Sequence, residues 1–140
     1  MARPEQNADG SANLMKWKCV IPGKDGTDWA GGFYPVTMEF SSDYPAKAPK
    51  VSLPKGFFHP NIYPSGKVCL SIINDNPAEG GQWKPAIAIK QILLGVQELL
   101  DQPNNSDPAQ IEGYEMLRKD PAKYKRRVKE ERGKYTTPPF

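Results

Sequence analysis

The hydrophobic periodicity of this 140-residue sequence changes once along the chain, from a period of two in the first third to a helical period in the last third. Apolar and polar side chains alternate over residues 14–21 and again over 34–40, and Val51 and Leu53 mark a shorter third run. Such alternation is typical of strands that bury one face. Strands at hairpin spacing that precede all the helices predict an antiparallel β-meander in an α+β fold.

Three helices are predicted in the last third of the chain. The first has apolar residues at helical spacing, so it is expected to be the central helix packed on the meander, and it ends before Pro103. Residues 107–110, Asp-Pro-Ala-Gln, combine a capping acid with proline at the first helical position and predict a second helix over 108–118. A second Asp-Pro pair predicts the third helix over 121–134. The apolar stripe of the central helix consists of Ile89, Ile92, Leu93, Val96, Leu99 and Leu100.

The composition is that of one globular domain, with 38% apolar and 25% charged residues. No apolar run approaches the roughly 18 residues of a membrane span, and the first ten residues contain no signal-peptide core. A soluble intracellular protein with no membrane contact is therefore expected. We divide the chain into a polar N-terminal segment over 1–13, a core domain over 14–136 and a C-terminal tail over 137–140.

The cysteine and histidine positions do not fit the common structural metal sites. Cys19 and Cys69 lie 50 residues apart, and His59 is the only histidine. This spacing matches neither a zinc finger nor a disulfide framework. No metal site is predicted.

The net charge of +3 is unevenly distributed along the chain. Residues 118–140 contain nine Lys or Arg and three Asp or Glu. A basic tail of this kind fits an acidic partner or nucleic acid. A solvated helix face is the more common meaning of such a charge run, so nucleic-acid binding is not expected.

Residues 54–83 have no persistent periodicity and are interrupted by glycines and prolines. A long irregular segment inside a compact domain is usually functional or disordered. This one holds His59 and Cys69. From the residues alone, Cys69 is either an accessible thiolate nucleophile or a small buried hydrophobe between two apolar neighbours. Cys19 lies in a predicted strand and is assigned to the core.

Several motifs follow one another in a fixed order around this segment. His59-Pro60-Asn61 precedes Cys69, and Trp83-Lys84-Pro85-Ala86 follows it. With Trp29-Ala30-Gly31-Gly32 and Asp43-Tyr44-Pro45, they resemble the ubiquitin-conjugating enzyme family over about residues 14–135. The similarity is greatest to the branch that conjugates SUMO, in the stretches Ile21-Pro22-Gly23-Lys24, Tyr63-Pro64-Ser65-Gly66, Cys69-Leu70-Ser71-Ile72 and Asp107-Pro108-Ala109-Gln110.

The resemblance implies the ubiquitin-conjugating fold and a transferase activity. Such an enzyme would accept SUMO from the SUMO-activating enzyme as a thioester on Cys69 and pass it to lysines of protein substrates, with SUMO ligases as further partners. No bound cofactor is expected, because ATP is used by the activating enzyme. A monomer found in nucleus and cytoplasm is expected. A ubiquitin-conjugating enzyme is the alternative within the same family.

The resemblance assigns three residues to catalysis beside Cys69. Asn61 offers an amide donor for the oxyanion that develops when a lysine attacks the thioester, although a turn-forming Asn has the same sequence signature. Tyr63 would line the slot of the acceptor lysine, which must lose its proton before it attacks. Asp107 would orient that lysine, and its alternative role is the helix cap.

The resemblance also assigns supporting and substrate-binding residues. His59 and Pro60 are expected to be structural, with the imidazole nitrogens bonded to backbone. SUMO acceptors present a bulky apolar residue, the lysine, any residue and an acid, and Lys50 is the candidate partner of that acid. Ser65 would be a neighbouring contact or a plain turn residue. Gln110 and Tyr114, one helical turn apart, would border the groove for the lysine stem.

The sequence departs from the family pattern at its start. Relatives have a basic amphipathic helix before the first strand, and residues 1–13 are too polar and too rich in turn formers to replace it. In the family this helix helps to bind the activating enzyme, so slow or absent loading of Cys69 is expected. A noncatalytic adaptor of the same fold is therefore the alternative to an enzyme.

Three further features are noted. Lys67, two residues before Cys69, could lower the thiol pKa if its ammonium is close. The segment 74–82 is longer than the corresponding loop of close relatives. Val128-Lys129-Glu130-Glu131 fits the acceptor pattern and suggests self-modification at Lys129, although a predicted helix there favours the structural alternative.

Overall fold

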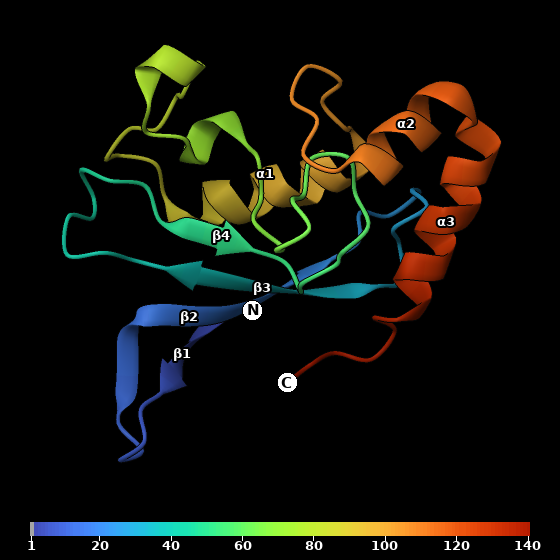
Figure 1. Cartoon of the computed structure of the whole chain (residues 1–140). Coiled ribbons are helices and arrows are strands. Elements are labelled where there is room, and N and C mark those ends of the chain that lie inside the picture. The colour runs from blue at the N-terminus through green and yellow to red at the C-terminus, as the bar shows by residue number, and fades with distance from the viewer. Residues whose placement is uncertain (1) are drawn as a thin grey trace.

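The structure is a computed structural model and describes residues 2–140. One antiparallel sheet has the strand order β1-β2-β3-β4. α1 lies across one face of this sheet, and α2 and α3 stand at one end of it (Figure 1). The α+β meander predicted from the sequence is confirmed. The strands are β1 (Ala2–Gln6), β2 (Ala12–Pro22), β3 (Phe33–Glu39) and β4 (Lys50–Ser52), and the helices are the short 3₁₀ turns η1 (Ser71–Ile73) and η2 (Pro77–Glu79) and then α1 (Ile89–Asp101), α2 (Ile111–Lys119) and α3 (Pro121–Gly133).

The strand β1 was not predicted, because Ala2–Gln6 shows no alternation of apolar and polar residues. It pairs antiparallel with β2 after a tight reversal in which Asn7 N–H donates to the Ser11 carbonyl at 2.8 Å. Pro4 is tolerated because β1 is an edge strand with one free side. Residues 2–6 and 12–13 of the polar N-terminal segment 1–13 thus belong to the sheet, and Met1 lies outside the described residues. Within residues 2–140, no helix precedes β2.

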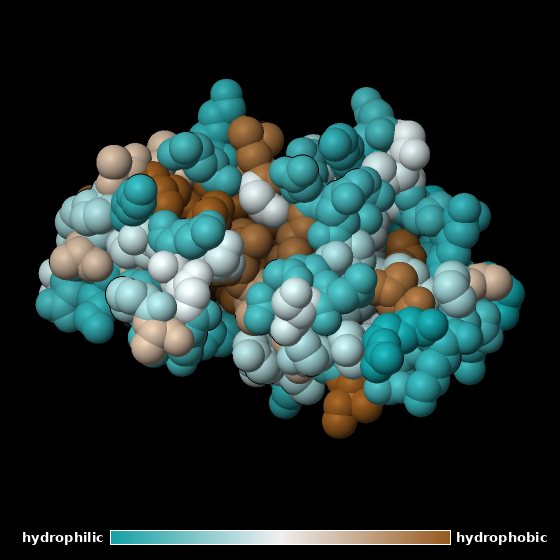
Figure 2. Space-filling model, turned by 90° about the horizontal axis from the view of Figure 1, so that it is seen from above, coloured by the Kyte–Doolittle hydropathy of each residue, from teal (hydrophilic) through white to brown (hydrophobic). Residues whose placement is uncertain are grey.

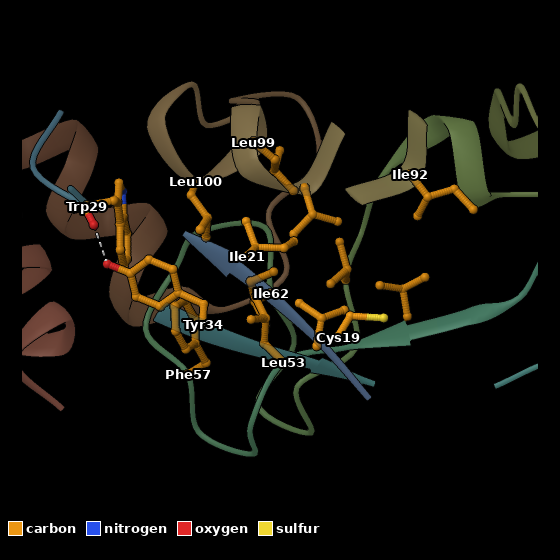
Figure 3. Packing of buried hydrophobic residues seen from close by; sticks show 14 of the residues in the cluster. Cys19, Ile21, Trp29, Tyr34, Leu53, Phe57, Ile62, Ile92, Leu99 and Leu100 are labelled. Carbon is orange, nitrogen blue, oxygen red and sulfur yellow. Dashed lines mark hydrogen bonds between the residues drawn. The ribbon is translucent and has the colours of Figure 1, made fainter. Parts of the chain in front are cut away.

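The core lies between the sheet and α1 (Figure 3). Alternate residues of β3, starting at Tyr34, are buried in one cluster with α1. Four residues of the predicted stripe of α1 are buried and two are partly buried; the buried ones are Ile92, Val96, Leu99 and Leu100, and the others are Ile89 and Leu93. The Tyr34 hydroxyl donates to the Trp29 carbonyl at 2.6 Å, so a phenol at the edge of the core is satisfied. Cys19 is 1% exposed and belongs to the core, as expected, whereas Met15 at the far end of the same alternation is 46% exposed.

The irregular segment is part of the core although it forms no long strand. Phe57, Phe58, Ile62 and Val68 are all fully buried. Its backbone is held by scattered hydrogen bonds, including Leu53 N–H to Gly66 and Val68 N–H to Val51. Buried backbone groups need such partners, so side-chain burial and hydrogen bonds together order a segment that has no period.

The start of α2 differs from the prediction. The helix begins at Ile111 rather than at residue 108, and its N-cap is Gln110. The N–H groups of Ala109 and Gln110 both donate to the Pro60 carbonyl, at 2.8 and 3.3 Å. Residues 107–110 therefore stay outside the helix, and Ala109 and Gln110 bond to the segment that precedes Cys69.

The glycine in α2 has a packing function. A Cβ on Gly113 would lie 3.1 Å from the Pro60 nitrogen and 3.2 Å from the His59 carbonyl carbon. Glycine is a poor helix former, but at this position it allows α2 to lie close to the backbone of the irregular segment.

The C-terminal helix α3 is anchored by a buried carboxylate. Glu131 is 1% exposed, and it accepts hydrogen bonds from Phe58 N–H at 3.1 Å, Arg127 at 3.0 Å and Lys134 at 2.9 Å. Val128 is also buried, at 2% exposure. The apolar and the second acidic residue of the candidate acceptor motif around Lys129 are therefore packed in a helix, which favours the structural alternative over self-modification.

His59 ties the irregular segment to the end of α1. Its Nε2 donates to the Leu99 carbonyl at 2.8 Å, and its Nδ1 accepts from Asn61 N–H at 3.0 Å. These partners fix the tautomer of the ring. Burial lowers the pKa of His59 from 6.5 to about 4, since the charged imidazolium would be cut off from water.

We predict that folding stability falls as the pH drops from 7 to 5. The pKa of His59 is lowered in the folded state, so the unfolded chain binds the proton more tightly. Stability from this group is complete above the unfolded pKa of 6.5 and is lost on the way down to about 4. Urea unfolding should show a loss of about 2 kcal/mol between pH 7 and 5. An unfolding free energy that does not change over this range would contradict the assignment.

Candidate active site

A groove of about 720 Å³ runs along the face that carries η1 and η2, and we call it the Cys69 groove. Cys69, Tyr63 and Asp107 line it together with Lys50 and Lys67. Seen from above, hydrophobic surface lies in a recess between two hydrophilic lobes (Figure 2). The structure thus brings together side chains from β4, the irregular segment and the loop before α2. Within residues 2–140, no group of three or more His, Cys, Asp or Glu side chains is placed to hold a metal ion.

Cys69 is held at the wall of this groove by its backbone. Its N–H donates to the Asn61 carbonyl at 2.9 Å, and the preceding Val68 is buried and bridges Ile62. The side chain is half-buried, unlike that of the core residue Cys19. The position fits the first of the two interpretations of Cys69, a thiol that a reactant can reach.

The surroundings of Cys69 favour the neutral thiol. Burial and the nearby Asp107 carboxylate raise its pKa, and they outweigh the Tyr63 hydroxyl and the Lys67 ammonium, which lower it. Lys67 is therefore close enough to act on Cys69 in the direction that the sequence suggested. The charge of Lys67 does not reverse the net increase in the pKa of Cys69.

Tyr63 is exposed by 40% at the edge of the groove, and its hydroxyl lowers the pKa of the neighbouring Cys69 thiol. The negative charge of a Cys69 thiolate is the main cause that raises the pKa of Tyr63 above its ordinary value. The phenol therefore keeps its proton at neutral pH. It can donate to sulfur or to a developing oxyanion, but it is not a base.

Asn61 is fully buried and uses its side-chain amide to hold the loop before α2. Its Nδ2 donates to the carbonyls of Asn104 at 2.7 Å and Asp107 at 2.8 Å, and its Oδ1 accepts from Asn104 N–H at 2.8 Å. Both amide hydrogens are thus engaged. To donate to an oxyanion, as expected from the sequence, Asn61 would have to release one of these carbonyls.

Asp107 reaches the groove from this clamped loop. Its side chain is exposed, and its Oδ2 accepts from the Asn104 amide at 2.9 Å. It caps no helix, because α2 begins four residues later. The helix-cap interpretation of Asp107 is therefore wrong, and its carboxylate faces the same groove as Cys69.

The predicted substrate contacts fall into two groups. Lys50 is exposed and lines the Cys69 groove, whereas Ser65 is exposed in the Pro64–Gly66 turn and is not among the lining residues. The Ser65 hydroxyl accepts weakly from Lys67 N–H at 3.4 Å, which fits a turn residue.

Gln110 and Tyr114 also lie outside the lining of the groove. The Gln110 amide donates to the carbonyls of Phe57 at 2.9 Å and Ile62 at 2.8 Å. Tyr114 is half-buried and lies beneath the Arg118 guanidinium, 5.2 Å from its ring centre. The side chain of Gln110 thus fixes the irregular segment, and its contact with an acceptor stays a prediction.

Two residues of the site were not predicted from the sequence. Asn104 links Asn61 to Asp107 through its backbone and its side chain, and Glu79 of η2 lines the groove near Cys69. The polar run at residues 104–106 was a signal for a hydrogen-bonded loop. Nothing in the sequence pattern placed Glu79 beside the groove.

The chain is similar to known proteins over most of its length. Residues 2–132 match the model of the ubiquitin-conjugating enzyme family. The chain is 60% identical to the SUMO-conjugating enzyme SCE1 of Arabidopsis thaliana over 129 residues, which cover 92% of this chain and 78% of the relative. It is 51% identical to the SUMO-conjugating enzyme ubc9 of Dictyostelium discoideum, covering 98% and 84%, and 48% identical to UBC9 of Caenorhabditis elegans, covering 96% and 79%. No helix within residues 2–140 is long and apolar enough to cross a membrane.

We predict that Cys69 is a slow thiol at neutral pH. Because its pKa is raised, the thiolate fraction and the rate of alkylation by iodoacetamide should rise about tenfold per pH unit and not level off by pH 9. The measurement uses a Cys19→Ser background, so that a single thiol reacts.

Two charge variants test the causes of this shift. At pH 8, Asp107→Asn should speed alkylation and Lys67→Met should slow it, each by about threefold for a half-unit change of pKa. A rate that is flat above pH 7, or faster alkylation in Lys67→Met, would show that the charges around the thiol are wrongly assigned.

Proposed function

The chain belongs to the ubiquitin-conjugating enzyme family, and we propose that it is a SUMO-conjugating transferase that works through a thioester at Cys69. The observation that carries this proposal is the half-buried Cys69 thiol in a groove that it shares with the phenol of Tyr63 and the carboxylate of Asp107. The similar proteins of three organisms, all SUMO-conjugating enzymes by name, support the choice of modifier.

In the loading step, the Cys69 sulfur attacks the carbonyl carbon of the thioester between SUMO and the activating enzyme. A new carbon–sulfur bond forms at Cys69, the old one breaks, and the thiol of the activating enzyme takes up the proton that Cys69 gives up. One thioester replaces another, so the exchange requires no further source of energy. The Tyr63 hydroxyl, which lowers the pKa of Cys69, favours the thiolate during this step.

In the transfer step, the neutral amine of an acceptor lysine attacks the Cys69 thioester. An isopeptide bond forms, and sulfur leaves and recovers a proton, so the enzyme returns to its starting state. Asp107 attracts the ammonium form and aligns it, but it also raises the lysine pKa. Desolvation against the ring of Tyr63 acts in the opposite direction. We assign Asp107 to alignment rather than to proton removal.

In the enzyme without SUMO on Cys69, Asn61 is a positioning residue for the groups around the thiol. Its amide holds the loop that carries Asp107, and its carbonyl holds Cys69. One of its amide hydrogens becomes a donor to the oxyanion only if a carbonyl is exchanged during transfer. Lys50 and Lys67 on the groove supply the positive charge for an acidic residue that follows the acceptor lysine.

The partners proposed for the chain are SUMO, its activating enzyme, lysine-bearing substrates and SUMO ligases. No bound cofactor is assigned, since ATP would be used by the activating enzyme before SUMO reaches Cys69. The chemistry derived above needs only the thiol, the donors around it and the incoming amine.

We predict a thiol-sensitive SUMO adduct on this chain. Incubation with SUMO, its activating enzyme and ATP should give a band shift that reducing agent removes. Cys69→Ala should abolish the shift, whereas Cys19→Ser should keep it, because Cys19 is buried in the core. A parallel reaction with ubiquitin and its activating enzyme should give no adduct.

The alternatives give different outcomes in the same assay. A folded chain that gives no adduct with either modifier is a noncatalytic adaptor, and an adduct with ubiquitin in place of SUMO identifies a ubiquitin-conjugating enzyme. Circular dichroism of each variant shows that the fold is intact.

A further inference from the structure

The segment 74–81 forms an ordered wall of the Cys69 groove. Asn76 caps η2 by accepting from Ala78 N–H at 3.0 Å, and Gly80 ends it in a left-handed conformation. Gly81 then packs so tightly that a Cβ there would lie 2.2 Å from the Asn74 carbonyl oxygen. In Figure 1 this segment stands at the top of the molecule, above η1.

The base of the segment is tied to the rest of the protein. The Asp75 carboxylate accepts a hydrogen bond at 2.9 Å from the N–H of Ala48, which lies in the connection between β3 and β4. Trp83, just after the segment, donates from Nε1 to the Pro45 carbonyl at 2.9 Å. Attachments on both sides hold the segment in place, so Glu79 at its tip has a defined position.

The groove has cations and carboxylates on different segments, and besides Glu79 its carboxylates are Glu39, Asp43, Asp75 and Asp107. Lys50 belongs to β4 and Lys67 to the irregular segment, while Glu79 belongs to η2, and all three line the same groove. Within residues 2–140, no ion pair joins Glu79 to either lysine. Glu79 is exposed, and its recorded hydrogen bond is a long one, from the Asn74 amide at 3.3 Å. Its charge therefore remains available to a ligand in the groove.

Glu79 also acts on the reactive groups. Its charge contributes to raising the pKa of Cys69 and of Tyr63, which places it within electrostatic reach of the thiol. Glu79 and Cys69 line the same groove, so an acceptor bound there can contact both.

We propose that Glu79 is a specificity residue that selects acceptor segments with Lys or Arg between the modified lysine and the acid that follows it. The proposal rests on the proposed function, since it names the substrate class of the same groove. In an extended segment, successive side chains point to opposite sides of the backbone. The residue after the acceptor lysine thus points to the side opposite to both the acceptor lysine and the acid, toward the second wall of the groove. When the acid pairs with Lys50 or Lys67, a cation at the intervening position can meet Glu79.

The test compares acceptor peptides that differ in one side chain. Each has the order apolar residue, lysine, test residue, acid, and the test residue is arginine, its uncharged analogue citrulline, or glutamate. Single-turnover transfer from the preloaded chain is measured for the unmodified protein, for Glu79→Gln and for Glu79→Lys. Glu130→Gln is the matched control, because Glu130 is an exposed carboxylate on α3 that does not line the groove.

The unmodified protein and Glu130→Gln should modify the arginine peptide about two- to fivefold faster than the citrulline peptide, as expected for an exposed ion pair. Glu79→Gln should make the two rates equal, and Glu79→Lys should favour the glutamate peptide. Equal rates in the unmodified protein, or a preference that survives Glu79→Gln, would overturn the proposal.

A second measurement separates this proposal from the proposed function. Binding of the same peptides to the chain without SUMO on Cys69, measured by fluorescence anisotropy, needs no thioester. The same arginine preference, lost in Glu79→Gln, supports the role of Glu79 even if Cys69 is never loaded. Equal binding of the arginine and citrulline peptides by the unmodified protein counts against it, even if Cys69 is loaded.

Discussion

The site depends on the mutual hydrogen bonding of two irregular segments, residues 57–62 and 104–110. Asn61 bonds to the backbone of Asn104 and Asp107, while the Pro60 carbonyl accepts from Ala109 and Gln110. Neither segment satisfies its polar groups within itself. Each supplies what the other lacks, and the result places Asp107 on the same groove as Cys69. Buried polar groups that are fully paired in this way fix a single arrangement, because any other arrangement leaves them unsatisfied.

The elements that carry a period could be predicted from the sequence, and those that depend on distant partners could not. The alternation of β2 and β3 and the apolar stripe of α1 were visible, because each buries one face. β1 was missed because a polar edge strand is ordered by pairing rather than by its own pattern. The start of α2 was misplaced because residues 107–110 have the local features of a cap but bond to Pro60 instead.

The same distinction applies to the site residues. Cys69 and Asp107 were predicted from motifs, and the structure brings both to one groove. The motif could not show that the amide hydrogens of Asn61 are both engaged, or that Gln110 bonds to Phe57 and Ile62 rather than lining the groove. Those facts depend on which carbonyls the fold brings within reach.

The electrostatics of the groove favour the neutral thiol of Cys69 over the thiolate. Burial and the Asp107 carboxylate hold the pKa of Cys69 up, so the free enzyme presents little thiolate at neutral pH.

The central claim is that Asn61 organises the transfer step by holding the Asp107 loop. The most direct test is the single-turnover transfer of SUMO from preloaded Asn61→Ala to free lysine, compared with the unmodified chain. The account predicts a stable thioester at Cys69 and transfer slowed by at least about tenfold, because the loop that carries Asp107 is no longer held in position to align the acceptor lysine. Transfer at the unmodified rate would contradict it.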